Sequence, residues 1–263
     1  MIWRNPSRSP SSAKQGRRAF TLLELLIVIG VIAILASISI PAIKGITQSN
    51  LLAAANRQLL DDLAFARLKA LNERTTVYVV FIPPSIFQRL ALESNPKERR
   101  YITNLVSGQY TSYALLASRT VGDQPGQATP HYITEWKALP EGMLIAPYKF
   151  TNAPPSELVR LGINEYLRPF AYEGALPFPN SRSARLAEFR LPYIAFNAQG
   201  QLTSERDEII PLARGSIFYP KNASGQYTTA PADVQLTPPN QEFQFVRINW
   251  LTGRAKVEVP EFD

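Results

Sequence analysis

The chain has 263 residues, 45% of them apolar, which is enough for one large core or two small ones. It contains no cysteine, and this excludes disulfides, thiol catalysis and cysteine-type zinc sites. Its single histidine, His131, cannot form a histidine-rich metal site, and we interpret it as a surface residue. A formal charge of +7 is compatible with a nucleic-acid partner only if the basic residues form a surface on the folded part of the chain.

The basic character is concentrated at the amino terminus. Five of the 28 Lys and Arg side chains lie in residues 1–19, and none of the 21 Asp and Glu side chains does. The remainder of the chain therefore carries 23 basic and 21 acidic side chains and is close to neutral. A surface that binds polyanions is not indicated, so nucleic acid is not an expected partner.

An apolar segment follows this basic leader, from Phe20 to Ile40, and Glu24 is its only charged residue. As a helix the segment would be about 30 Å long, which is one hydrocarbon thickness. The positive-inside rule then predicts a cytoplasmic amino terminus and a translocated carboxy-terminal part. We predict a transmembrane helix over residues 20–41, so that the chain crosses the inner membrane once.

A cleaved secretory signal is the main alternative, with Leu35-Ala36-Ser37 as its cleavage region. Two features argue against it: Glu24 interrupts the start of the apolar core, and the helical pattern continues well beyond the membrane. A buried core helix of a soluble protein is a further alternative, but the apolar stretch is longer than most globular cores cover.

The residues around the start of the segment carry a family resemblance. Arg17-Arg18-Ala19-Phe20-Thr21-Leu22-Leu23-Glu24-Leu25 resembles the class III signal of type IV pilins and type II secretion pseudopilins. In that family a prepilin peptidase removes a basic leader before a Phe, and the new amino terminus is methylated. The resemblance implies cleavage between Ala19 and Phe20, and N-methylation of Phe20. Ala19 is a departure, because the family strongly prefers Gly before the cut.

Glu24 is costly in a membrane segment, by about 2.5–3.5 kcal/mol at mid-bilayer on insertion scales, although a helix amino terminus favours its charge. The resemblance implies that Glu24 pairs with the free amino group of a neighbouring subunit's first residue, which would couple charge neutralisation to assembly. The alternative is a carboxylate that only reaches the membrane interface. The resemblance also places Pro41 where these proteins commonly have a helix-loosening proline.

Residues 42–74 keep helical spacing beyond the apolar segment. Apolar residues recur there at steps of three and four and form one stripe, Leu52, Ala55, Leu59, Leu63, Ala66 and Ala70. Leu68 lies on the opposite face, where a neighbouring subunit could cover it. We predict one helix from Phe20 to about Asn72, whose second half is amphipathic and packs on a sheet of the same chain.

Residues 75–263 are predicted to form an extracytoplasmic, β-rich head. Residues 75–82 are rich in β-branched and aromatic side chains and form the first strand. Further strands are predicted over residues 101–105, 110–118, 143–146, 193–197, 243–250 and 254–259. A weaker strand over residues 209–212 would be confined to a sheet edge by Pro211. Gly253 is predicted to form the turn of a terminal hairpin, and residues 197–200 a second tight turn.

Two segments are interpreted as insertions on the head. Residues 83–100 suggest a short helix over residues 85–93 and a loop, and residues 150–183 are proline-spaced and poorly periodic; such segments serve recognition or are mobile. The order of the long helix, the Val-rich strand, Leu139–Met143 and Ile194–Gly200 resembles the H-type minor pseudopilin and related minor pilins. The resemblance implies an α+β fold, with the amino-terminal helix packed on an antiparallel sheet.

No sequence motif for phosphate binding, zinc proteolysis, serine hydrolysis or calcium binding is found, so no catalytic residue, cofactor or metal site is predicted. The acidic residues are expected on helix or loop surfaces, among them Asp61, Asp62, Glu205, Asp207 and Glu208. Tyr110, Tyr113, Arg119 and the arginines of residues 182–190 could form a strip for single-stranded DNA, but ordinary surface arginines are the simpler interpretation.

We therefore expect a structural, non-enzymatic minor subunit of a type II secretion pseudopilus or a type IV pilus-like filament. The expected partners are a prepilin peptidase and methyltransferase, other pilin or pseudopilin subunits, and the inner membrane. A DNA-binding minor pilin involved in DNA uptake is the first alternative, which salt-dependent binding by the head would reveal. A membrane-anchored periplasmic enzyme is the second, which a pocket of convergent acids or hydroxyls would favour.

Overall fold

The structure is a computed structural model that describes residues 21–124, 128–151, 153, 156, 159, 164–174, 176–183, 185, 189–228, 232–237 and 243–258, without the side chains of residues 36–49. The chain divides into two compact units, Met1–Gln48 and Ser49–Asp263. The described part of the first unit is helical from Leu22 onward. The second unit contains all of the described strands.

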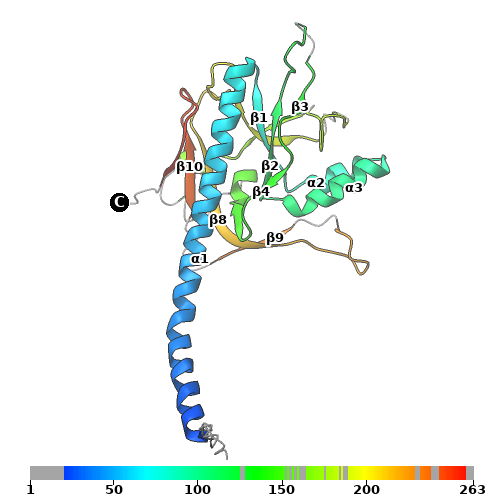
Figure 1. The fold of residues 1–263 in the computed structure, drawn as a ribbon. Coiled ribbons are helices and arrows are strands. Elements are labelled where there is room, and N and C mark those ends of the chain that lie inside the picture. The colour runs from blue at the N-terminus through cyan, green and yellow to red at the C-terminus, as the bar shows by residue number, and fades with distance from the viewer. Residues whose placement is uncertain are drawn as a thin grey trace, which may run out of the picture. The chain divides into compact units, whose positions relative to one another are not determined.

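Helix α1 runs from Leu22 to Glu73, blue to cyan in Figure 1. The helix predicted from Phe20 to about Asn72 has therefore been found at almost the predicted bounds. Pro41 lies inside α1 and does not end it. A bend at Pro41 stays a prediction.

Two antiparallel sheets form the β-rich part of the second unit. The first sheet has the strand order β3 (His131–Tyr132), β2 (Ser112–Ala117), β1 (Val77–Phe81), β7 (Leu191–Phe196) and β6 (Ala171–Glu173), with β4 (Lys137–Ala138) also paired to β2. The second has the order β11 (Ala255–Glu258), β10 (Gln244–Ile248), β8 (Glu208–Phe218) and β5 (Met143–Ile145), with β9 (Asp233–Leu236) paired to β8. The predicted α+β class with antiparallel pairing is confirmed.

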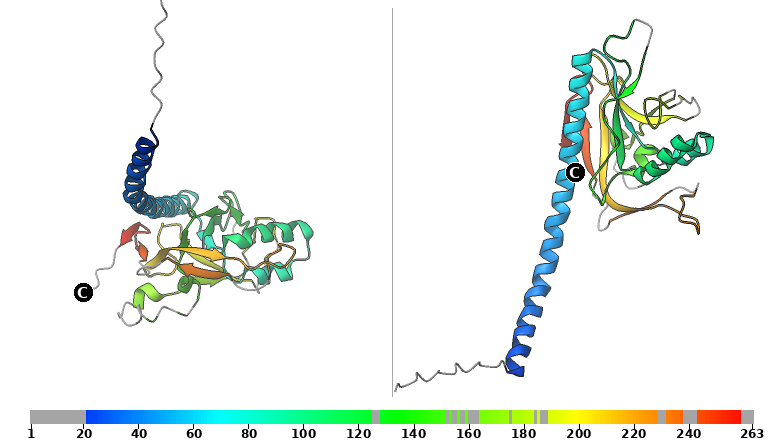
Figure 2. Two further views of the ribbon diagram at one scale, coloured as in Figure 1. Left: turned by 90° about the horizontal axis from the view of Figure 1, so that it is seen from below. Right: turned by 45° about the vertical axis from the view of Figure 1, so that its right-hand side comes forward.

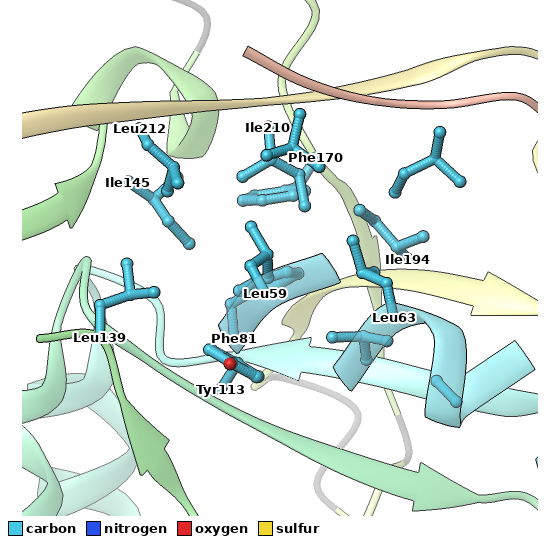
Figure 3. Close-up of a cluster of buried hydrophobic side chains, with 14 of the residues drawn as sticks. Leu59, Leu63, Phe81, Tyr113, Leu139, Ile145, Phe170, Ile194, Ile210 and Leu212 are labelled. Atoms are coloured by element: carbon cyan, nitrogen blue, oxygen red, sulfur yellow. The ribbon is translucent and has the colours of Figure 1, made fainter. Parts of the chain in front are cut away.

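The apolar stripe of α1 packs into a core that both sheets share. Ala55, Leu59, Leu63, Ala66 and Ala70 are all completely buried, as the helical spacing predicted. Figure 3 shows Leu59 and Leu63 among side chains that come from both sheets, such as Phe81, Tyr113 and Ile194 from the first, and Ile210 and Leu212 from the second. The carboxy-terminal part of α1 is thus an integral element of the head.

A second core covers the other face of the first sheet. Helices α2 (Ile86–Leu92) and α3 (Pro96–Leu105) lie on the side of β1 and β2 away from α1 (Figures 1 and 2). Buried side chains of the two helices, of the first sheet and of residues 178–189 form one cluster. Its members are Val80, Ile82, Ile86, Ile102, Val106, Ala114, Phe178, Phe189 and Leu191. Parts of both predicted insertions are therefore core elements of the head.

The helix predicted over residues 85–93 is confirmed as α2, but the strand predicted over residues 101–105 is wrong. Those residues form the second half of α3. Its start was legible in the sequence: the Asn95 side chain accepts a hydrogen bond from the Lys97 N–H at 3.0 Å, and Pro96 occupies the first helical position. The β-branched residues around Ile102 had suggested a strand, but Ile102 is buried as part of an amphipathic helix.

The prediction that Pro211 restricts its strand to an edge is also wrong, because β8 lies between β10 and β5. Strand β5 ends at Ile145, which pairs with Leu212, so the next residue, Ala146, lies opposite Pro211. There the Ala146 N–H donates to the Pro211 carbonyl at 2.9 Å, while the Ala146 carbonyl accepts from the Lys149 N–H at 3.0 Å. Pro211 has no N–H to donate to the Ala146 carbonyl, but that carbonyl already accepts a hydrogen bond from Lys149. The missing donor therefore leaves no buried acceptor unpaired.

The two predicted turns are confirmed. Strands β10 and β11 form the terminal hairpin, and Gly253 has a φ of +62° in its turn. Gly200 has a φ of +74°, and its N–H donates to the Asn197 carbonyl at 2.8 Å. Both turns use the left-handed backbone region that glycine adopts without steric cost.

Glu208 is buried in β8, so its expected place on a surface is wrong. Its carboxylate accepts a hydrogen bond from Lys149 Nζ at 3.1 Å, and Lys149 is also buried. Lys149 Nζ donates to the Arg168 carbonyl at 2.9 Å and lies 4.8 Å from the centre of the Phe170 ring. Burial lowers the pKa of Lys149, and the Glu208 carboxylate opposes that shift.

Candidate functional site

Glu24 lies in the first turn of α1. Because the helix begins at Leu22, Thr21 is the residue that caps it and Glu24 is its third residue. Thr21 Oγ1 accepts a hydrogen bond from the Glu24 N–H at 3.1 Å, and the Thr21 carbonyl accepts one from the Leu25 N–H at 3.2 Å. The first turn is therefore stabilised by its own sequence, and the Glu24 carboxylate lies where the helix dipole favours negative charge.

The capping role of Thr21 was not among the predictions. The signal was present, because Thr21-Leu22-Leu23-Glu24 has the threonine and glutamate spacing of a capping box. The cap bond uses the backbone N–H of residue 24 and not its side chain. The position of the carboxylate and the capping of the helix can therefore be changed separately.

Glu24 lies among exposed apolar side chains. The large apolar residues between Leu22 and Leu35 are 44% to 83% exposed. Soluble proteins rarely expose so long a continuous apolar surface. Among the described residues, no helix meets the combined length and apolarity required of a membrane-crossing helix.

The other predicted processing and assembly residues are only partly described. Ala19 and Phe20 lie outside the described residues, as does the side chain of Pro41. The structure therefore places only Glu24, now with Thr21 beside it. None of the ion pairs found within the described parts of the chain involves Glu24.

A family model described as the prokaryotic N-terminal methylation motif matches residues 14–40. The chain carries a prepilin-type methylation motif. The match includes Ala19, Phe20 and Glu24 and ends one residue before Pro41. This motif supports the pilin family, and it implies processing by a prepilin peptidase and assembly with other pilins. Neither the curated proteins nor the solved structures gave a match.

The methylation motif covers the amino terminus only and does not extend into the head. The strip proposed for single-stranded DNA does not exist as predicted. Tyr113 is completely buried and Tyr110 is 7% exposed, so neither ring can stack on a base. Arg185 and Arg190 donate to backbone carbonyls of the head, those of Ala128 and Tyr172.

Tyr113 belongs instead to a polar cluster that joins α1 to the first sheet. Its hydroxyl donates to Asp62 Oδ2 at 2.7 Å, and Lys137 Nζ lies 2.6 Å from Asp62 Oδ1. Gln58 Nε2 donates to the Tyr113 hydroxyl at 3.1 Å. Asp62 is therefore not on the surface, as had been expected, but buried beside Tyr113, while the Lys137 side chain is 42% exposed. Burial and the Asp62 carboxylate raise the pKa of Tyr113, so its hydroxyl remains a donor.

A second polar cluster surrounds Arg247 on β10. The guanidinium bonds to Glu165 at 2.7 Å, to Asp207 at 3.3 Å, and to Glu258 on β11; it also bonds to the Tyr166 hydroxyl. Three carboxylates thus face one cation, and they connect the segment around Glu165 to the terminal hairpin. The described residues contain no group of side chains suited to a metal ion.

This cluster predicts an acid-sensitive contribution to stability. The hydrogen bond from Arg247 lowers the pKa of the Glu258 carboxyl below its ordinary value. Since that pKa is lower in the folded than in the unfolded chain, the stabilisation is present at neutral pH and lost as the pH falls below about 4.5 through the folded value. We expect Glu258→Gln to cost about 1 kcal/mol of unfolding free energy at pH 7 and less under acid.

Urea unfolding of both proteins between pH 7 and pH 3 measures this difference. Glu141→Gln is the matched control, because Glu141 is exposed and no partner is found for it in the described chain. The control should follow the wild-type pH profile. A Glu258→Gln protein that loses as much stability under acid as the wild type would contradict the prediction.

Proposed function

We propose that this chain is a structural minor subunit of a type II secretion pseudopilus or a type IV pilus-like filament. The proposal rests on one observation, the methylation motif over residues 14–40, which contains a lone carboxylate in the first turn of α1. The order of elements in the head adds the resemblance to the H-type minor pseudopilin. In this proposal the amino-terminal segment is held in the inner membrane before assembly, and the head is extracytoplasmic.

Electrostatics gives Glu24 its part in assembly. Cleavage before Phe20 would create an amino group, and an opposite charge about 4 Å away is worth roughly 1 kcal/mol in water and roughly 4 kcal/mol at an effective dielectric constant of 20. The pair therefore gains most where water is excluded, as between packed apolar helices. A subunit whose Glu24 is unpaired would be stabilised by a neighbour that supplies the amine.

The outer face of α1 in the second unit also supports contact with neighbours. Phe65 is 40% exposed and Leu68 is 51% exposed, and Leu68 lies on the side opposite the buried stripe. The helical spacing had predicted Leu68 on that face. Two neighbouring large apolar side chains make a suitable contact for another subunit, although single exposed apolar residues are ordinary on any surface.

Mass spectrometry of the mature amino terminus tests the proposed processing. We expect a chain that begins at Phe20 and carries an N-methyl group. Ala19→Gly is the matched variant, because it supplies the residue that the family prefers, and it should be cut at the same bond at least as completely. A mature chain that begins near Ala36, as after an ordinary secretory signal, would overturn the proposal.

The first alternative, a DNA-binding minor pilin, has no specific observation in its favour. A DNA-binding role would need exposed aromatic rings on which bases could stack, but Tyr110 and Tyr113 are core residues. That the chain performs no catalysis stays a prediction. A turnover measured with the purified head would contradict it.

A further inference from the structure

A small pocket lies on the face of the first sheet that α1 does not cover. It has a volume of about 250 Å³ and is lined by Tyr101 of α3, by residues 132–136 from the end of β3 onward, and by residues 179–181. Two of its aromatic residues, Tyr132 and Trp136, pack against the second core. Because α1 packs on the opposite face of this sheet, contacts made by α1 would leave the pocket open.

The walls of the pocket are held in place by the protein itself. The Tyr132 hydroxyl donates to the Pro177 carbonyl at 2.9 Å, and Trp136 Nε1 donates to the Pro179 carbonyl at 2.9 Å. The Ser181 hydroxyl accepts from the Tyr132 N–H at 2.9 Å. These polar groups are already bonded, so a ligand would meet mainly the apolar surfaces of preorganised rings.

Two lining groups remain available for a ligand. Tyr101 is 44% exposed, and Glu135 is exposed as well. Neither the Tyr101 hydroxyl nor the Glu135 carboxylate has a hydrogen-bond partner among the described residues, whereas the other polar side chains named above do. The pocket therefore offers aromatic surface, the Tyr101 hydroxyl that donates or accepts, the Ser181 hydroxyl that accepts one bond and can still donate, and one carboxylate that only accepts.

This combination selects a neutral ligand with hydroxyl donors. A carboxylate in the lining repels phosphate groups, which argues against a nucleic-acid strand. Two exposed cations lie beside the lining and not in it, Lys97 one helical turn before Tyr101 and Arg182 next to Ser181, and their charge disfavours a cationic ligand. The volume lies below the roughly 300–1,000 Å³ of pockets for drug-sized ligands, so it suits one small ring.

We propose that this pocket binds one neutral sugar ring. The apolar face of the ring would lie against Tyr132 or Trp136, and its hydroxyls would bond to Glu135 and Tyr101. The proposed structural role does not require the head to bind a ligand, so the sugar site goes beyond that role. Its test is therefore independent of filament assembly.

Saturation-transfer NMR on the full mature chain tests the site. The detergent must contain neither a sugar nor a quaternary ammonium group, since either could occupy the pocket. The probes are glucose, galactose, mannose, N-acetylglucosamine and their disaccharides, each titrated to about 50 mM. A ligand of this size is expected to bind with a Kd on the order of 1–10 mM.

Variants at the two available groups should weaken binding by about tenfold or more, namely Glu135→Gln and Tyr101→Ala. Tyr101→Phe keeps the ring and should weaken binding less. The matched controls are Glu141→Gln, an exposed acid, and Phe218→Ala, an aromatic residue that is 54% exposed on β8. Both controls should bind as the wild type does, and all variants should share its thermal midpoint.

Three outcomes would overturn the proposal. The first is that none of the sugars shows saturable binding. The second is that Glu135→Gln and Tyr101→Ala bind a sugar as tightly as the controls do. The third is that tetramethylammonium or an oligothymidylate, and no sugar, binds the wild type and is lost in both variants, since the pocket would then serve another class of ligand.

Discussion

Glu24→Val should reduce incorporation of the subunit into filaments by more than about tenfold, while the unassembled chain remains in the membrane fraction. Removing a carboxylate from an apolar segment makes insertion easier, by at most the roughly 2.5–3.5 kcal/mol of a mid-bilayer position, so insertion should not suffer. Incorporation should suffer because the amino group of the neighbouring subunit would lose its counter-charge in a place that excludes water. Sheared filaments and membranes, each probed for the subunit, give the two quantities.

The structure separates this effect from a simple loss of helix stability. The Thr21 side chain accepts its hydrogen bond from the backbone N–H of residue 24, which valine retains. Thr21→Ala removes the cap and keeps the carboxylate, at a cost of about 1 kcal/mol to the helix. We expect Thr21→Ala to be incorporated far better than Glu24→Val. Normal incorporation of Glu24→Val would refute the pairing role, and Glu141→Val on the head controls for loss of an acid.

Gly253→Ala should destabilise the head by more than about 3 kcal/mol. The backbone there has a φ of +62°, which costs a residue with a side chain about 1–2 kcal/mol. A Cβ at this position would also lie 2.0 Å from the Gly200 carbonyl oxygen and 2.9 Å from Arg67 Cδ. The carbonyl belongs to the backbone of the other tight turn and cannot move aside as a flexible side chain can.

Gly225→Ala is the matched control for this experiment. Gly225 has a φ of +76°, but a Cβ added there meets nothing within 4 Å. It should therefore cost only the conformational term, about 1–2 kcal/mol. Urea unfolding of both variants measures the difference. Equal destabilisation of the two proteins would show that the contact between the turns is not tight.

The position of Gly253 also explains how the terminal hairpin is joined to α1. Arg67 Nε donates to the Thr252 carbonyl at 2.7 Å, in the same turn. A Cβ at Gly200 would lie 3.1 Å from Leu71 Cγ, so the second turn packs directly on the helix as well. The hairpin and its turn were predictable from local sequence. The contact between two turns more than 50 residues apart was not.

Sequence patterns predicted the secondary structure correctly where neighbouring residues alone determine it. The helical stripe from Ala55 to Ala70, the first strand and the glycine turns all follow from periodicity and backbone preference. Local reasoning failed where a competing local signal was overlooked, as at Asn95-Pro96, which starts α3. The edge position predicted from Pro211 was wrong as well, because β5 ends before it would need a backbone N–H from residue 211.

The sequence by itself determined the amino-terminal part of this protein: the basic leader, the apolar segment with its lone Glu24, the methylation motif and the long helix. These features depend on composition and spacing within a short stretch, so no distant residue is needed to define them. Only the tertiary structure decided that Asp62 and Glu208 are buried with partners, that two apparent insertions build a second core, and that an aromatic pocket opens beside it. Burial and pairing depend on side chains far apart in the sequence, and folding alone brings them together.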